Sequence, residues 1–236
     1  LVSGGAGINP KVIEDFEAMG LPMLQGYGMT ENAPIIAANR DCYSKAASVG
    51  QPLPGTEVKI SNPDETGIGE IICKGPSVMQ GYYKNQEETD KVLIDGWLYT
   101  GDYGYLDKEG YLYITGRKKN VLIAKNGKNI FPEELESYLA ETGYIMESMV
   151  HEEASEKDDD VVIKAQIYPD FEKIQADKGQ LDEAQLREFI GSLVDQVNEK
   201  LPLYKRIKRF AIRQEEFEKT TTRKIKRHSA SNYAQQ

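Results

Sequence analysis

Apolar and polar residues follow a strand, helix, strand order over the first 40 residues. LVSGGA predicts a short strand and a turn. NPKVIEDFEAMG predicts a helix, because Asn9 can cap it, Pro10 suits its first position and Gly20 can end it. PMLQGYG predicts a second, buried strand. This spacing favours a parallel αβ layer over residues 1–40.

The pattern changes between residues 41 and 115 to short strands with glycine and aspartate turns. TEVKISNPD and GEIICKG each predict one strand. WLYTGDYGYLDKEGYLYITG predicts a hairpin around DKEG, because aromatic and β-branched residues flank a turn-forming stretch. EETDKVL predicts a short helix between them. We therefore expect a β-rich section here.

A second, α+β unit is predicted to begin near Arg117, with the charged segment GRKKN as the joint. It starts with a hairpin around Asn126 and Gly127 and a helix over PEELESYLAET. Two strands then flank an acidic loop, and RFAIRQEEF predicts a last strand. A helix precedes that strand, since apolar residues recur at helical spacing at Leu186, Phe189, Ile190, Leu193, Val194 and Val197.

Composition limits the function classes. The chain has 236 residues and is 39% hydrophobic, enough for one large domain or two small ones. A net charge of −9 argues against a general nucleic-acid partner, which would need a basic face. Apolar runs are too short to span a membrane, and Cys42 and Cys73 stand in unrelated contexts, which predicts a reduced, cytoplasmic protein. Because Leu1 opens directly into a strand pattern, we expect a piece of a longer protein.

Two interpretations remain open for the polar pair that follows the glycines of QGYGMTEN. Thr30 can simply cap the turn that follows. Alternatively, its hydroxyl and neighbouring N–H groups can hold a phosphate, with Glu31 as an oxygen ligand for Mg²⁺.

Three further residues allow a structural or a functional interpretation. Asp102 is either a turn residue that binds its own backbone or a carboxylate for the two hydroxyls of a ribose. Arg117 is either solvated or part of a site. Lys224 is either one charge of a solvated basic tail or a cation delivered to an anionic reaction centre. Tyr82 and Tyr83 are predicted to pack rather than to serve as stacking platforms. The lone histidines, His151 and His228, are expected in charged loops and receive no role.

The order of these motifs resembles the AMP-forming acyl-CoA synthetase family, which includes luciferases and peptide-synthetase adenylation domains. The matching segments are SGGAG, QGYGMTE, GEIICKGPSVMQGYYKNQEET, WLYTGDYGYLDKEGYLYITGRKKN, GKNIFPEELE and TTTRKIKR. GYGMTENAPIIAANR and GKNIFPEELE resemble the bacterial long-chain fatty-acid–CoA ligases. The implied fold is the adenylate-forming enzyme fold with an incomplete N-terminal domain: an α/β part, a β-rich subdomain and a small α+β domain.

The resemblance implies domain boundaries and an activity. Residues 1–115 would be the C-terminal part of the large adenylation domain, residues 116–120 the hinge and residues 121–236 the small domain. Such enzymes use ATP and Mg²⁺ to turn a fatty acid into an acyl-adenylate, and then transfer the acyl group to coenzyme A. Alternatives are transfer to a carrier protein and a catalytically silent nucleotide-binding module. The partners would be the acid, coenzyme A and the missing N-terminal part, with peripheral membrane contact possible and the isolated chain inactive.

The resemblance also implies roles for individual residues. Thr30 would contact the α-phosphate, Glu31 would bind Mg²⁺ and Lys224 would act at the α-phosphate and carboxylate. Asp102 and Arg117 would bind the ribose, and Lys119 would be the hinge position. The glycine turn Gly4, Gly5 and Ala6 would lie beside the adenine and the acyl pocket. The strand residues Gln25, Gly26 and Tyr27 would lie against the adenine, and Gly28 would also bind the nucleotide. The hairpin VLIAKNGKNIF would line the coenzyme A tunnel. One departure stands out: Arg223 replaces the glycine usual before the lysine.

Overall fold

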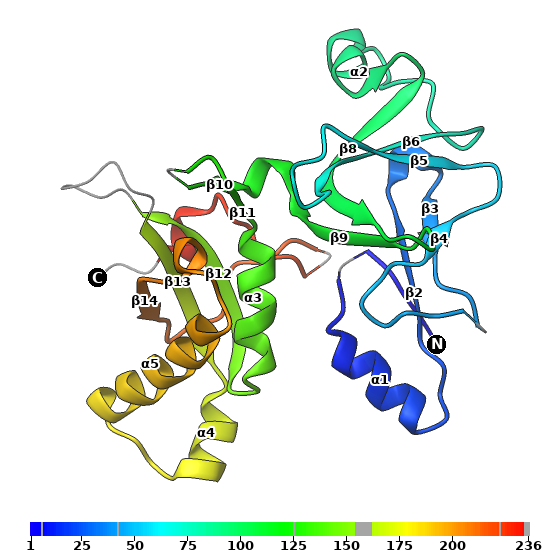
Figure 1. The fold of residues 1–236 in the computed structure, drawn as a ribbon. Coiled ribbons are helices and arrows are strands. Elements are labelled where there is room, and N and C mark those ends of the chain that lie inside the picture. The colour runs from blue at the N-terminus through cyan, green and yellow to red at the C-terminus, as the bar shows by residue number, and fades with distance from the viewer. Residues whose placement is uncertain (6, 42, 125, 154–161, 222, 234–236) are drawn as a thin grey trace. The chain divides into compact units, whose positions relative to one another are not determined.

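The computed structural model describes residues 1–5, 7–41, 43–124, 126–153, 162–221 and 223–233. They form two compact units, Leu1–Lys119 and Asn120–Gln236, which are described separately below (Figure 1). The division falls inside the charged segment 116–120. Ala6 and Cys42 lie outside the described residues, as does most of the acidic loop after Glu153.

The first sheet of the first unit has the order β1-β2-β3-β4. Its strands are β1 (Val2–Ser3), β2 (Leu24–Gly28), β3 (Ile35–Ala38) and β4 (Gln51–Pro52). Helix α1 (Pro10–Ala18) joins β1 to β2, and Asn9 caps it by accepting the backbone N–H of Lys11. The structure has the predicted parallel pair, β1 with β2, but β3 and β4 continue the sheet in antiparallel fashion.

The second sheet of this unit is antiparallel throughout. Its strands are β5 (Glu57–Ser61), β6 (Gly69–Lys74), β7 (Leu93–Ile94), β8 (Trp97–Leu106) and β9 (Leu112–Arg117), and α2 (Gln86–Val92) precedes β7. The order is β5-β6-β8-β7, with β9 paired to β8. Asp107 closes the predicted β8–β9 hairpin, because its side chain accepts the backbone N–H groups of Glu109 and Tyr111. Both sheets contribute to one core, which contains Tyr27, Ile36, Ala37, Val49, Ile71, Cys73, Leu98 and Leu112.

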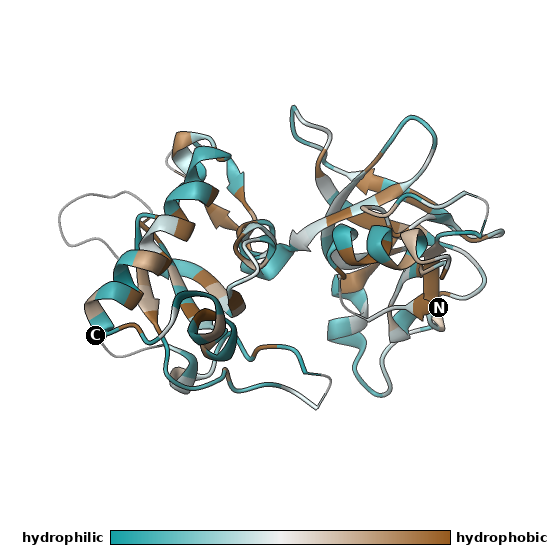
Figure 2. Ribbon diagram, turned by 90° about the horizontal axis from the view of Figure 1, so that it is seen from below, coloured by the Kyte–Doolittle hydropathy of each residue, from teal (hydrophilic) through white to brown (hydrophobic). Residues whose placement is uncertain are grey.

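The second unit packs helices on a three-stranded sheet of order β12-β13-β14. Its elements are β10 (Leu122–Ile123), β11 (Asn129–Ile130), α3 (Pro132–Glu141), β12 (Ile145–Glu153), β13 (Val162–Pro169), α4 (Phe171–Lys178), α5 (Glu183–Glu199) and β14 (Arg209–Ile212). β12 and β13 are antiparallel, and β13 and β14 are parallel. The predicted stripe of α5 is buried at Ile190, Leu193, Val194 and Val197. Hydrophobic residues gather on strands and inner helix faces, while the exposed loops are mainly hydrophilic (Figure 2).

The structure corrects several sequence predictions. Helix α4 was not predicted, because Ile174 is its single buried residue and leaves almost no periodicity. Tyr83 does not pack, since it is 87% exposed. His151 lies in β12 rather than in a loop, and its ring meets Tyr233 edge-on. The solvated-tail interpretation is wrong for Asn232, which is fully buried.

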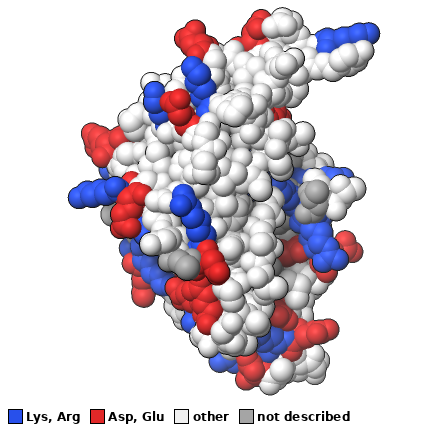
Figure 3. Space-filling model, turned by 90° about the vertical axis from the view of Figure 1, so that its right-hand side faces the viewer, with Lys and Arg blue, Asp and Glu red and all other residues white. Residues whose placement is uncertain are grey.

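Charge and length of the elements bear on possible partners. Acidic and basic side chains are interspersed around a broad uncharged area on the face seen in Figure 3. The net charge of −9 is therefore not gathered into one patch of this face. In the part of the chain that the structure describes, every helix is too short or too polar to cross a membrane.

Candidate functional site

The loop that follows β2 folds back closely on itself. After Gly28 and Met29 the chain forms a 3₁₀ turn, Thr30–Asn32, and then enters β3. The N–H of Met29 donates to the carbonyl of Pro34 at 2.7 Å. A Cβ on Gly28 would lie 1.9 Å from that carbonyl oxygen, so a side chain at this position would displace the returning backbone. The second glycine of GYG is therefore needed for the shape of the loop.

Thr30 is exposed at the beginning of this turn. The cap position belongs to Met29, and no side chain caps the turn, so the capping interpretation of Thr30 is wrong. Among the described residues, no hydrogen bond occupies the Thr30 hydroxyl. A hydroxyl held on a tight turn and left open to solvent can donate to an incoming anion.

Glu31 is half-buried and is held through both its backbone and its side chain. Its carbonyl accepts the N–H of Met79 at 2.8 Å, and its Oε1 accepts the hydroxyl of Tyr82 at 2.9 Å. Burial, followed by this hydrogen bond, raises the pKa of Tyr82. Tyr82 therefore has a polar contact beyond the predicted packing, because its hydroxyl holds one oxygen of the Glu31 carboxylate and leaves Oε2 for another ligand.

Asp102 lies at the centre of a second polar cluster. It is 4% exposed and stands directly opposite Arg117 in the β8–β9 ladder. Its Oδ1 pairs with Arg117 Nε at 2.7 Å, and its Oδ2 accepts the hydroxyl of Tyr27 at 2.7 Å. Burial, with the Asp102 charge second, raises the pKa of Tyr27 far above its ordinary value, so Tyr27 is a fixed donor. Three residues that the sequence separates by up to 90 positions thus meet at one carboxylate.

The other residues predicted near a nucleotide lie on the same strands. Gln25 is buried on β2 and stands opposite Ser3 of β1, and Gly26 stands opposite Ala38 of β3. Gly4 approaches Gly26, since a Cβ built on it would lie 3.5 Å from the Gly26 carbonyl oxygen. Gly5 follows directly after Gly4, and Ala6 is outside the described residues.

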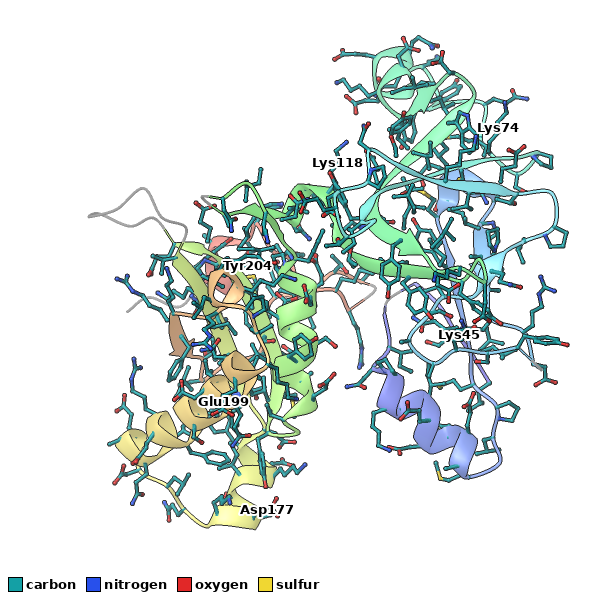
Figure 4. All side chains as sticks on the ribbon, in the orientation of Figure 1. Lys45, Lys74, Lys118, Asp177, Glu199 and Tyr204 are labelled. Atoms are coloured by element: carbon teal, nitrogen blue, oxygen red, sulfur yellow. The ribbon has the colours of Figure 1, made fainter. Side chains whose placement is uncertain are left out.

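Glu70 is a polar residue of this region that the sequence did not single out. It is 7% exposed on β6. Its Oε1 accepts the N–H of Gly101 at 3.2 Å, and its Oε2 pairs with Lys118 Nζ at 2.6 Å. Lys118 is labelled in Figure 4. Glu70 raises the pKa of Lys118. One carboxylate therefore links the backbone just before Asp102 to the segment just after Arg117, next to Lys119 in the 3₁₀ turn Lys118–Asn120.

Lys224 belongs to the second unit, where it lies on an exposed loop. Lys219 and Ile225 form a single antiparallel bridge at the base of this loop. The N–H of Thr220 donates to the Lys224 carbonyl at 2.8 Å, and the Lys224 N–H donates to Thr220 Oγ1 at 3.2 Å. The Lys224 side chain itself is exposed, as a residue that meets a substrate needs to be.

The chain is similar in sequence to known enzymes. Residues 1–83 match the family model described as AMP-binding enzyme. The chain is 44% identical over 158 residues to a long-chain-fatty-acid–CoA ligase of Bacillus subtilis (strain 168), covering 63% of this chain and 28% of the relative. It is 42% identical over 153 residues to a 2-succinylbenzoate–CoA ligase of Oceanobacillus iheyensis, covering 62% of this chain and 31% of the relative.

Solved structures extend the likeness to almost the whole chain. The o-succinylbenzoate CoA synthetase (MenE) from Bacillus subtilis, in complex with the acyl-adenylate intermediate OSB-AMP, matches with a TM-score of 0.82 and 30% identity. The match covers 99% of this chain and 46% of that chain. Another structure of MenE holds ATP and a magnesium ion and matches with a TM-score of 0.80. This chain therefore spans under a third of the length of the two curated relatives and under half of the solved ones.

Proposed function

We propose that this chain, a relative of the AMP-binding, adenylate-forming enzymes, forms part of an ATP-dependent acid–CoA ligase that works through an acyl-adenylate. The observation that carries the proposal is the Asp102 cluster. Tyr27 donates to one oxygen of the buried carboxylate and Arg117 pairs with the other, so both oxygens are held in place. A buried carboxylate with both oxygens fixed suits the two vicinal hydroxyls of a ribose.

The nucleotide would extend from this cluster along β2. Asp102 and Arg117 would bind the ribose, and the adenine would lie against Gln25, Gly26 and Tyr27, near Gly5. The phosphates would then reach the turn after β2, where the Thr30 hydroxyl donates to the α-phosphate. Gly28 would contribute by giving this turn its close backbone approach.

Glu31 is suited to a magnesium ion that ATP brings with it. Its carboxylate is half-buried, Tyr82 occupies one oxygen, and the other oxygen remains for a metal. Among the described residues, no group of three or more His, Cys, Asp or Glu side chains could hold a metal on its own. A single carboxylate together with substrate phosphates is the donor set that Mg²⁺ commonly uses, and the bound ion would offset phosphate charge.

The chemistry consists of two displacements. In the first, an oxygen of the acid attacks the α-phosphorus, the bond to pyrophosphate breaks and an acyl-adenylate forms. Thr30 and Lys224 would stabilise the negative charge that gathers there, Lys224 as a point charge. In the second, the thiol of coenzyme A attacks the acyl carbonyl and AMP leaves. Lys119 would be the hinge about which the second unit turns between the two steps. The β10–β11 hairpin would line the path of coenzyme A.

A long-chain fatty acid is the substrate that we propose first, since the relative with 44% identity acts on such acids by its name. A second candidate is 2-succinylbenzoate, because a ligase for that acid is 42% identical and MenE shares the fold over nearly all of this chain. The acid pocket decides between the two acids, because the residues discussed above would meet the nucleotide or the carboxylate, which both acids share.

The test uses the intact protein that contains this chain. Release of AMP and pyrophosphate is followed with ATP, Mg²⁺, coenzyme A and a series of fatty acids, with 2-succinylbenzoate alongside. We expect AMP release to require both an acid and coenzyme A. We also expect Lys224→Ala to lose adenylation while it still converts supplied acyl-adenylate. Nucleotide binding without AMP release from any acid would instead favour a silent module. AMP release that required an unloaded carrier protein, with its free thiol, in place of coenzyme A would change the proposed acceptor.

A further inference from the structure

The loop that carries Lys224 is attached to the second unit by two legs. The outgoing leg meets β12, where Glu147 pairs with Lys219 and its Oε2 accepts the N–H of Phe217 at 3.2 Å. The returning leg begins with Lys226, whose N–H donates to the Glu218 carbonyl at 2.9 Å. Asn232 joins both legs, because its side chain donates to the carbonyls of Glu218 and Lys226 at 3.0 Å each.

Arg227 ends the returning leg, three residues after Lys224, and its side chain turns into the unit. Nη2 pairs with Glu136 Oε2 of α3 at 2.5 Å, and Nη1 donates to the Val150 carbonyl of β12 at 3.1 Å. Glu136 Oε1 in turn accepts the N–H of Val150 at 2.6 Å. The arginine side chain is 20% exposed and that of Glu136 is 18% exposed. A helix, a strand and the loop leg are thus closed into one ring of charge-assisted hydrogen bonds.

The surroundings of Glu136 favour a guanidinium beside it. Burial raises the pKa of Glu136 to about 7, while Arg227 acts in the lowering direction. Glu133, on the previous turn of α3, lies 3.7 Å from Arg227 Nη2 and adds a second negative charge. An arginine placed between two carboxylates of one helix is held by geometry as well as by charge, since its planar fork reaches Glu136 and Val150 at once.

We propose that Arg227 and Glu136 are positioning residues, which fix the Lys224 loop on the second unit so that Lys224 is presented for the adenylation step. The inference rests on the proposed role of Lys224. A loop with an exposed tip loses conformational freedom when its base is fixed, and a positioned cation stabilises an anionic transition state better than one that must first be ordered. The thioester step, which would use the β10–β11 hairpin instead, does not depend on this clamp.

The experiment compares Arg227→Gln and Glu136→Gln with a matched control, Glu134→Gln. Glu134 lies on the same helix, and its 2.7 Å ion pair with Lys205 is also partly buried. The first readout is amide hydrogen exchange on this chain, resolved for residues 217–227 and for α5. We expect exchange to rise about tenfold or more over residues 217–227 in both clamp variants and to stay unchanged in the control, because one or two charge-assisted hydrogen bonds are lost. Protection of α5 should persist in all three, which shows that the unit remains folded.

The second readout separates the half-reactions in the intact protein. We expect the clamp variants to lose about 10- to 100-fold in acyl-adenylate formation, and to convert supplied acyl-adenylate at an unchanged rate. Arg227→Lys should recover only part of the loss, since it keeps the charge but not the fork. Unchanged exchange over residues 217–227, or an equal loss in both half-reactions, would overturn the positioning role. Raised exchange in a protein whose parent forms no acyl-adenylate would refute the proposed function and the catalytic part of this inference, but not the clamp.

Discussion

Arg223 has a backbone conformation that suits glycine better than arginine. Its φ is +61°, in the left-handed region, at the position where the resembling motif usually has glycine. A side chain there costs about 1 kcal/mol or more, because Cβ approaches the following carbonyl. We predict that Arg223→Gly stabilises the chain by up to about 1 kcal/mol, measured as slower amide exchange over residues 217–227. Adenylation should be retained or faster.

The control for this change is Lys108→Gly, at an exposed turn residue whose φ is not positive. Glycine there removes no strain and adds freedom to the unfolded chain, so we expect a small loss of stability or none. If Arg223→Gly behaved like Lys108→Gly, the arginine would be contributing an interaction that offsets its conformation. Slower adenylation with unchanged exchange would assign its charge a role at the phosphates.

Tyr27 allows a test of the Asp102 cluster. Tyr27→Phe removes the 2.7 Å donor to Asp102 and leaves a buried carboxylate oxygen without that partner. We predict a loss of about 1–3 kcal/mol in the free energy of unfolding of the first unit and weaker binding of AMP. Trp97 is the single tryptophan of the chain and lies in this unit, so its fluorescence reports the unfolding.

Tyr43→Phe serves as the control, because Tyr43 is 69% exposed. Loss of its hydroxyl should change neither the free energy of unfolding nor the binding of AMP. Weaker AMP binding at unchanged stability would mean that Tyr27 contacts the nucleotide but does not stabilise the fold through Asp102. Unchanged values of both would remove the Asp102 cluster as the basis of the proposed ribose site.

At this scale the sequence predicts residues better than it predicts their partners. Asp102, Arg117 and Tyr27 could be singled out because each stands in a motif whose order along the chain is distinctive. Tyr82 and Glu70 could not, because their roles arise from contacts 51 and 31 positions away in the chain. The conformation of Arg223 was equally hidden, although the missing glycine marked the position.

At the scale of the elements, the ionised carboxylate of Glu218 stabilises the Lys224 loop. The ion pair with Lys226, followed by hydrogen bonds from Ser229 and Ser231, lowers the pKa of Glu218 to about 2 from an ordinary value of 4.5. The folded-state pKa is depressed, so this stabilisation is present above pH 4.5 and is lost as the pH falls towards 2. We predict that exchange over residues 217–227, corrected for intrinsic rates, rises when the pH is lowered from about 5 to about 3.

Glu218→Gln should raise this exchange at pH 5 and remove most of its dependence on pH. Glu215→Gln is the control, because Glu215 makes no side-chain ion pair among the residues described, and it should keep the parent's pH dependence. A parent-like pH profile in Glu218→Gln would show that other carboxylates dominate, and would remove Glu218 as an anchor of the loop.

Elements with clear local signals were predictable. The helix α5 combines an apolar stripe with a capping box between Asp182 and Gln185, and α1 has its asparagine cap and proline. Helix α4 lacked such a stripe, and the C-terminal segment looked solvated because its composition is polar. The C-terminal segment is instead held in place by buried Asn232 and Phe217 and by the ion pairs of Glu147 and Glu136. No local sequence pattern reveals these contacts.

For the whole molecule, the order of the motifs was more informative than any single motif. It predicted the relationship to AMP-binding, adenylate-forming enzymes, which the comparisons confirm. The identity of the acid was harder to predict, because relatives with similar identity are named for different acids and this chain covers only part of their length. The hinge at residues 116–120 and the roles of the site residues stay predictions, which the half-reaction experiments test.

The two units each have a separate core, which predicts that they unfold separately. Ile71 is fully buried in the core of the first unit and Leu135 in that of the second. Each change to alanine should cost about 2–5 kcal/mol in its own unit, through lost burial and the cavity left behind. In urea, Ile71→Ala should shift the transition of the first unit, monitored by Trp97 fluorescence, to lower denaturant concentration. The transition of the second unit, monitored by amide exchange of α5, should stay in place. Leu135→Ala should do the reverse. If either change shifted both transitions equally, the chain would unfold as one cooperative body, and a hinge that lets the second unit reorient between two half-reactions would lose its physical basis.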